Sequence, residues 1–126
     1  MANIGLTKNY TAEAAILANR IVKAGAADYA VLQAAGATAA DKSIGISTEI
    51  DSAIGERVDV VHEGIAELKL GGTVARGDPL TSDATGRGVA AAPGAGVNNR
   101  VIGFALISGV VDDLIPVLIN PHMMQG

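Results

Sequence analysis

His62 is the residue whose type could most directly support catalysis, because a histidine beside a carboxylate can act as a general base. Glu63 follows it directly in the chain. Serines that could serve as its nucleophile lie upstream, at Ser43, Ser47 and Ser52. None of them stands in the Gly-x-Ser-x-Gly turn that exposes a serine nucleophile between a strand and a helix. We therefore expect His62 to end a strand, at the surface or in a subunit contact.

Metal ligands are scarce in this chain, which has no cysteine and only two histidines. The second histidine, His122, lies close to the end of the sequence, where we expect a mobile tail. The acidic residues Glu49, Asp51 and Glu56 lack the alternating spacing of a calcium-binding loop. We therefore predict no metal site and no cofactor that depends on one.

Two glycine-rich stretches and one pair of carboxylates also fall short of a chemical motif. Gly86-Arg87-Gly88 and Gly94-Ala95-Gly96 do not lead into the Gly-Lys-Ser/Thr sequence that holds phosphate at the start of a helix. Asp112 and Asp113 are adjacent, so on an extended segment they point to opposite faces and cannot work as an acid and base pair. The sequence predicts no catalytic residues and no enzyme.

Composition removes several classes of partner. The net charge is -4 and the 9 Lys and Arg residues are scattered, so we expect no binding to a nucleic acid backbone. The longest apolar run, 101–111, is interrupted by Gly and Ser and is shorter than the roughly 20 residues that span a bilayer. The first ten residues lack the apolar stretch of a secretion signal, so synthesis in a cytoplasm is expected.

The chain is poor in aromatic residues, with 1 Phe, 2 Tyr and no Trp. Aromatic side chains supply much of the buried area in cores and ligand pockets. A domain of 126 residues with an aliphatic core would gain stability from association with other copies or with a larger lattice.

Short aliphatic runs bounded by Gly, Pro, Asp or Asn predict a series of strands. The clearest is 65–70, in which Ala66, Leu68 and Leu70 alternate with Glu67 and Lys69. Further strands are expected at 29–33, 43–48, 57–62, around residue 89, at 100–107 and at 114–119. Turns are expected at 76–79 and 82–86.

The fold predicted from this spacing is mainly β, a small antiparallel barrel or sandwich. Residues 1–11 lack periodicity and are expected to form an extended N-terminal arm, followed by a single β-rich domain over residues 12–126. The segment 11–23 is compatible with a capped helix or with a strand. Pro116 cannot donate to a ladder, so the last strand is expected at a sheet edge or at a bulge.

An internal echo predicts two similar β-units. Residues 42–47 (KSIGIS) recur as 100–105 (RVIGFA), and each is followed by an acidic turn and an aliphatic strand, at 57–61 and 114–119. Upstream, residues 22–25 are matched loosely by 74–77. Gly45 and Gly103 would then be equivalent positions at which two backbones approach closely or a strand bends.

The order and spacing of these elements resemble the capsid cement, or head decoration, proteins of tailed bacteriophages. The residues that carry the resemblance are Asp59 to Ala66, Gly71-Gly72, Arg76-Gly77-Asp78-Pro79-Leu80-Thr81-Ser82-Asp83, Gly86, Arg100 to Ala105, and Val117-Leu118-Ile119. Residues 8–13 resemble the extended opening segment of the family, which favours a strand over a helix at the start of the domain. The alanine-rich stretch 34–40 departs from the shortest relatives.

The resemblance implies a structural virion protein on the capsid exterior that clamps neighbouring capsomers and stabilises the expanded head. It also implies binding to the major capsid protein and self-association, as a homotrimer or in some members a dimer. From its polar, aperiodic composition we expect the arm to bind the capsid by adding a strand to a sheet edge, through the residues Asn3, Ile4, Leu6, Lys8, Asn9 and Tyr10. The alternatives are another structural virion component, such as a tail or spike-base subunit, or a small-ligand-binding β-barrel.

Overall fold

The computed structural model describes residues 3–126, and the regular secondary structure of these residues consists of strands. The strands are β1 (Asn3–Ile4), β2 (Thr7–Ala12), β3 (Ile21–Ala24), β4 (Ala30–Gln33), β5 (Ser43–Ser47), β6 (Arg57–Val61), β7 (Gly64–Lys69), β8 (Pro79–Ser82), β9 (Gly88–Ala90), β10 (Asn98–Ala105) and β11 (Leu114–Gln125). None of the described residues forms a helix long and apolar enough to cross a membrane.

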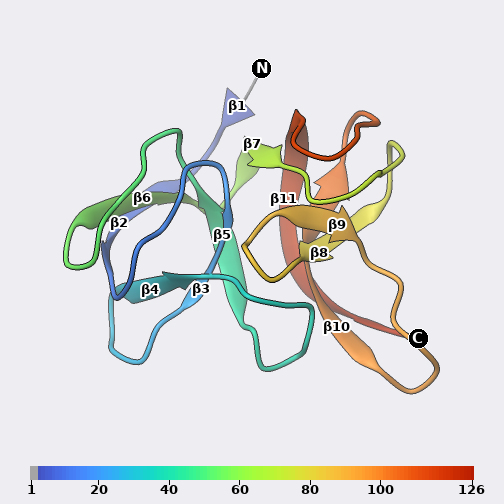
Figure 1. Cartoon of the computed structure of the whole chain (residues 1–126), viewed down its shortest axis with the longest axis horizontal. Coiled ribbons are helices and arrows are strands. Elements are labelled where there is room, and N and C mark those ends of the chain that lie inside the picture. Colours follow the sequence, from blue (N-terminus) through green and yellow to red (C-terminus); the bar gives the residue numbers. More distant parts are fainter. Residues whose placement is uncertain (1–2) are drawn as a thin grey trace.

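The strands form two halves that lie side by side in Figure 1. The first half is a closed barrel in the order β2-β4-β3-β5-β6, and the second is a 6-stranded sheet in the order β1-β7-β11-β10-β8-β9. The named pairs are antiparallel except β2 with β4. The structure therefore confirms the predicted mainly-β fold with a small barrel.

The two halves repeat one topology. Followed from β2, the barrel runs β2-β6-β5-β3-β4 and returns to β2, and the sheet runs β7-β11-β10-β8-β9. The sheet half also bends back on itself, because Leu70 and Gly88 form a parallel bridge that corresponds to the parallel pairing of β2 with β4. The predicted echo is thus confirmed for β5 with β10 and for β6 with β11.

The upstream part of the echo was matched in the wrong register. By strand order the counterpart of β3 is β8, whereas residues 74–77 lie in the loop before β8. Strand pairing shows that Pro79 is the counterpart of Ile21. Ile21 on β3 pairs with Ile46 on β5, and Pro79 on β8 pairs with Phe104 on β10. A proline in place of isoleucine hides the relation in the sequence.

Two hydrophobic clusters form the core. The cluster Ala12, Ile16, Val22, Val31, Val58 and Val60 fills the barrel. Successive strand residues point to opposite faces, so Ile21, Ile46 and Val61 lie on the outer wall of the barrel, where they join the core of the sheet half. β3, β5 and β6 are therefore buried on both faces where these three residues lie, and the two halves share one core.

Hydrogen bonds also join the halves. The N–H of Ile21 donates to the carbonyl of Gly86 at 2.8 Å, and the N–H of Lys69 donates to the carbonyl of Asn19 at 3.0 Å. The alanine-rich stretch 34–40 belongs to this contact, because the N–H of Arg100 donates to the carbonyl of Ala37 at 2.8 Å. The stretch thus docks the loop before β5 onto β10.

Asp41 holds the alanine-rich stretch in place and is only 7% exposed. Its Oδ2 accepts from the N–H groups of Ala35 and Gly36, both at 2.9 Å, and its Oδ1 lies 2.6 Å from Lys23 Nζ. Asp41→Ala leaves these donors without a partner and is expected to lower the free energy of unfolding by about 2 kcal/mol. Urea unfolding tests this, with the exposed Asp28→Ala as a control. A loss no larger than that of the control would contradict this role.

Three local predictions were wrong at the sheet half. Pro79 and Ser82 were expected in the turns 76–79 and 82–86 with no strand between them, but residues 79–82 form β8, because proline is tolerated as the first residue of a strand. Pro116 lies on β11 between β7 and β10, neither at an edge nor at the bulge, which falls between Val101 and Gly103. The expected mobile tail around His122 is instead the second part of β11, where His122 pairs with Val101.

The segment expected to be an arm contributes two strands. β1 pairs with β7 at the edge of the sheet, and β2 pairs along its length with β6. Residues 1 and 2 lie outside the described range. β4 joins β2 only at Thr11 and Ala12, so Thr7–Tyr10 has a paired strand on one side alone among the described strands.

Candidate functional site

His62 lies just after β6 and has both ring nitrogens engaged. Tyr10 Oη lies 2.7 Å from Nε2, and the carbonyl oxygen of Ile44 lies 2.9 Å from Nδ1. The carbonyl can only accept, so Nδ1 donates to it, and with Nδ1 carrying the ring hydrogen the Tyr10 hydroxyl donates to Nε2. His62 thus fastens β2 and β5 to the end of β6, which is a structural role.

The serines considered as nucleophiles also serve the backbone. Ser47 Oγ donates to the carbonyl of Leu17 at 2.8 Å, and Ser52 Oγ donates to the carbonyl of Arg57 at 3.1 Å. Neither hydroxyl is bonded to His62, so these two serines are not paired with the histidine as a nucleophile with its base would be.

The carboxylates near these serines are not gathered around a metal position. Asp51 accepts the N–H of Ala18 at 2.7 Å, and Glu56 accepts the N–H of Ala53 at 2.6 Å. Within residues 3–126 no three His, Asp or Glu side chains converge in a way that could hold a metal ion. Asp112 and Asp113 diverge as expected, toward Arg87 and the N–H of Val110.

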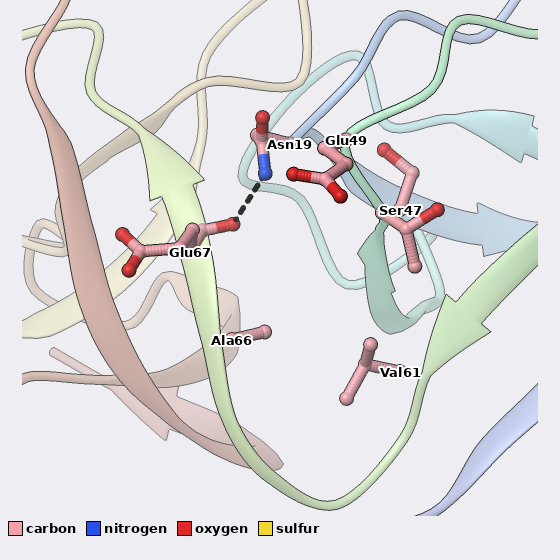
Figure 2. A pocket seen from close by; sticks show the side chains of 7 residues that line it. Asn19, Ser47, Glu49, Val61, Ala66 and Glu67 are labelled. Carbon is pink, nitrogen blue, oxygen red and sulfur yellow. Dashed lines mark hydrogen bonds between the residues drawn. The ribbon is translucent and has the colours of Figure 1, made fainter. Parts of the chain in front are cut away.

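A groove of about 270 Å³ lies where the barrel meets the sheet half (Figure 2). It is lined by Asn19, Ser47, Thr48, Glu49, Val61, Ala66 and Glu67. Asn19 Nδ2 bridges its walls by donating to the carbonyl of Glu67 at 3.3 Å. His62 is not among the lining residues, so the groove does not bring this histidine together with the carboxylates of Glu49 and Glu67.

Asp83 occupies the glycine-rich turn that was considered for phosphate binding. Its carboxylate accepts the N–H groups of Thr85 and Arg87 and the Nε–H of Arg87, each at 2.9 Å. Burial alone would raise the pKa of Asp83, but these donors and the charge of Arg87 outweigh it and hold the pKa below 3.8. The donors of this turn are therefore bonded to the Asp83 carboxylate, which takes the position that a bound anion would need.

This lowered pKa predicts a pH-dependent contribution to stability. A depressed pKa means that Asp83 stabilises the fold above its unfolded pKa, near 3.8, and that this is lost as the pH falls toward the folded pKa. Asp83→Asn should lower the free energy of unfolding by about 1 kcal/mol at pH 7. The difference from wild type should shrink below pH 3.8. Urea unfolding at pH 7 and pH 3 tests this, and an equal difference at both would contradict it.

The residues predicted to bind the capsid line the start of the chain. Asn3 and Ile4 pair with Ile65 and Gly64 of β7, and their side chains lie outside the described part. Leu6 is 52% exposed, and Lys8 Nζ lies 5.3 Å from the Tyr29 ring centroid.

Asn9 and Tyr10 are tied into the barrel. Asn9 Nδ2 donates to Asp59 Oδ1 at 2.9 Å, and its Oδ1 accepts from Arg57 Nε. Tyr10 is half-buried against His62. Leu6, Lys8 and Asn9 thus stand exposed along β2 and the residues before it, whereas the Tyr10 hydroxyl is engaged inside the molecule.

A row of apolar side chains crosses the outer face of the sheet half. Neighbouring strands place Ile65, Leu118, Phe104 and Pro79 side by side. Leu118 is 42% exposed, and the ring of Phe104 is stacked with that of His122 at 5.5 Å. In the barrel, the equivalent positions Ile21, Ile46 and Val61 are covered by the sheet half. The outer row is therefore an apolar surface without an equivalent covering among the described residues.

Comparison with known proteins decides the family. A sequence profile described as phage cement protein matches residues 2–110. The chain belongs to the phage cement protein family. This cement protein is therefore a structural protein of the phage head, as the resemblance in its turns and strands had implied. A comparison with curated proteins gave no match.

A solved structure shares the fold of this cement protein. It is the N base of the head fiber gp8.5 of bacteriophage phi29, with a TM-score of 0.65 and 18% sequence identity. The match covers 96% of this chain and 98% of the other. At this identity the likeness establishes a common fold over nearly the whole chain.

The apolar row was missed because no single stretch of sequence contains it. Its members come from four strands and meet only through their register. One indication was available, since residues 114–119 are apolar at both odd and even positions, which predicts a strand with two apolar faces.

Proposed function

We propose that this protein attaches to the outside of the phage capsid and cements neighbouring capsomers, so that the expanded head resists disruption. The observation that carries the proposal is the match of residues 2–110 to the cement protein family. The site geometry supports it, since the candidate catalytic groups are engaged within the fold. The protein would be made in the host cytoplasm and would use neither cofactor nor nucleic acid.

The major capsid protein is the proposed partner of the N-terminal segment, residues 3–10. Leu6, Lys8 and Asn9 are exposed there, and Thr7–Tyr10 has one side without a paired strand. A strand edge of this kind can take up an extended segment of another chain. The proposed contact thus uses an ordered strand, and ordering of a free arm on the capsid is not required for residues 7–10.

Deletion of residues 2–9 is a poor test of this contact, because it removes β1 and half of the barrel strand β2. Lys8→Glu and Leu6→Asp change exposed side chains and leave the pairing of β2 with β6 in place. Weaker binding to heads by both variants supports the contact, whereas wild-type affinity in both would refute it.

Self-association, as a trimer or a dimer, is proposed through the apolar row of Ile65, Leu118, Phe104 and Pro79. Contacts between permanently associated subunits are more apolar than the rest of a protein surface. Leu118→Glu tests the row, and Leu17→Glu is a matched control because both leucines are 42% exposed. Light scattering should show a smaller assembly for Leu118→Glu only. An unchanged mass would remove the row from the contact.

A second candidate function is the base of a head fiber, favoured by the fold shared with the gp8.5 N base. Both candidates are tested by sedimentation of purified protein with empty, expanded heads that lack tails. A cement protein should bind these heads in many copies and raise the temperature at which they break. Binding without any gain in head stability would favour the fiber base, and absence of binding would refute both.

A further inference from the structure

Two loops of this chain present exposed aliphatic side chains at equivalent places. The first connects β5 to β6 and the second connects β10 to β11, which are equivalent connections in the repeated topology. Ile50 and Ile54 in the first loop are 68% and 72% exposed. In the second loop Ile107, Val110 and Val111 are 47%, 54% and 51% exposed, and Ile107 and Val111 are the two that match Ile50 and Ile54 in position. Both loops therefore present aliphatic side chains to solvent.

Both loops are held by the same framework. Ser52 bridges to Ile16 in the first loop and Gly109 bridges to Val74 in the second, each through a reciprocal pair of backbone hydrogen bonds. Each exposed pair stands two residues before and two residues after the bridging residue: Ile50 and Ile54 around Ser52, and Ile107 and Val111 around Gly109. The apolar groups therefore occupy matching positions on matching scaffolds.

The turn after each bridge is also the same. The Glu56 carboxylate accepts the N–H of Ala53 at 2.6 Å, and the Asp113 carboxylate accepts the N–H of Val110 at 2.9 Å. The residue before each carboxylate has a positive φ, 83° at Gly55 and 70° at Asp112. The N–H of Gly55 donates to the carbonyl of Ala12, and the N–H of Asp112 donates to the carbonyl of Leu70, both at 2.8 Å. The loops are thus fixed before any partner binds.

We infer that the two loops are two copies of one docking element, which binds the same acceptor on two neighbouring subunits of the capsid lattice. One loop belongs to the barrel side of the molecule and the other to the sheet side, so a single chain reaches in two directions (Figure 1). A repeated element matched to a repeated lattice gains affinity from simultaneous attachment. The inference rests on the proposed function and deepens it, because it gives the means by which one chain ties two subunits together.

The chemistry of the loops defines the acceptor. Residues 48–56 contain Glu49, Asp51 and Glu56, and residues 106–113 contain Asp112 and Asp113. Neither stretch contains Lys or Arg, and of these carboxylates Asp112 is paired with Arg87 from outside the loop, at 3.3 Å. An apolar tip with an acidic surround fits an apolar recess rimmed by Lys or Arg. We assign this recess to the outer surface of the major capsid protein.

The test compares binding of four full-length variants to expanded, tailless heads by sedimentation. One variant carries Ile50→Ser with Ile54→Ser in the first loop, and another carries Ile107→Ser with Val111→Ser in the second loop. A third variant carries all four changes. The control carries Leu17→Ser with Val97→Ser, which are 42% and 50% exposed outside the loops. Light scattering and thermal unfolding verify that assembly and fold are unchanged.

Each single-loop variant should bind about tenfold or more weakly, because one buried aliphatic side chain contributes at least that factor. The variant with four changes should lose binding, and the control should bind like wild type. Wild-type affinity in either single-loop variant would overturn two-point docking, and a changed oligomer would assign the loops to contacts between copies. Failure of the wild-type protein itself to bind heads would instead refute the proposed function on which the inference rests.

Discussion

Gly103→Ala is expected to lower the free energy of unfolding by about 3 kcal/mol or to prevent folding, which is the upper range for overpacking. A Cβ atom at Gly103 would lie less than 3.0 Å from the carbonyl oxygen of Leu118 on the neighbouring strand. The obstacle is backbone within a paired ladder, so it cannot move aside as a flexible side chain would. Gly45 meets the carbonyl oxygen of Val61 in the same way, and Gly45→Ala should behave alike.

Gly36→Ala is the matched control for this pair. No atom would lie within 4 Å of a Cβ at Gly36, and its φ lies outside the left-handed region. The substitution should change the free energy of unfolding by less than about 1 kcal/mol. Thermal and urea unfolding measure all three variants, and a Gly103→Ala protein as stable as Gly36→Ala would show that the strands do not approach as closely as described.

Ile46→Ala is expected to lower the free energy of unfolding by about 2 to 5 kcal/mol, as other large-to-small changes in cores do. Ile46 is fully buried on the outer wall of the barrel, where its partners Ile21 and Val61 also face the sheet half. The change opens a cavity in the core that both halves share. Both halves should therefore lose stability together.

This variant also tests the prediction that residues 12–126 form a single domain. Wild type and Ile46→Ala should each unfold in one cooperative transition. Ile50→Ala is the control, because Ile50 is 68% exposed, and it should cost less than about 0.5 kcal/mol. Two separate transitions in calorimetry would contradict the single domain and indicate halves that fold independently.

Strand positions could be predicted from the sequence where one face is apolar. The alternation of Ala66, Leu68 and Leu70 with charged residues predicted β7, and all three are buried. The internal echo predicted the equivalence of Gly45 and Gly103, because the same crowding requires glycine in both halves. These features depend on local pattern, which a single sequence carries.

Features that depend on pairing between distant strands were not predictable in this way. β8 was hidden because it begins with Pro79, and the end of β11 was hidden because only its pairing with β10 orders it. The expected arm is extended because β1 pairs with β7 and β2 pairs with β6, and its own polar residues carry no pattern that indicates these strands. Tertiary contacts decided all three cases.

The same distinction between local sequence pattern and tertiary contact applies to the candidate site. The prediction that no catalytic motif is present came from residue types and spacing, whereas the bonds of His62 to Tyr10 and Ile44 depend on strands that are distant in the sequence. The apolar row and the paired loops depend on exposure, which follows from the packing of the two halves. The capsid-binding role of residues 3–10 stays a prediction.

Electron cryomicroscopy of expanded, tailless heads with and without the purified protein tests the central claim most directly. The account predicts added density on the outer surface of the shell, repeated over the lattice, into which the barrel and sheet halves fit and which contacts two neighbouring capsid subunits. Heads that look identical with and without the protein, or density confined to a single vertex or to the interior, would contradict it.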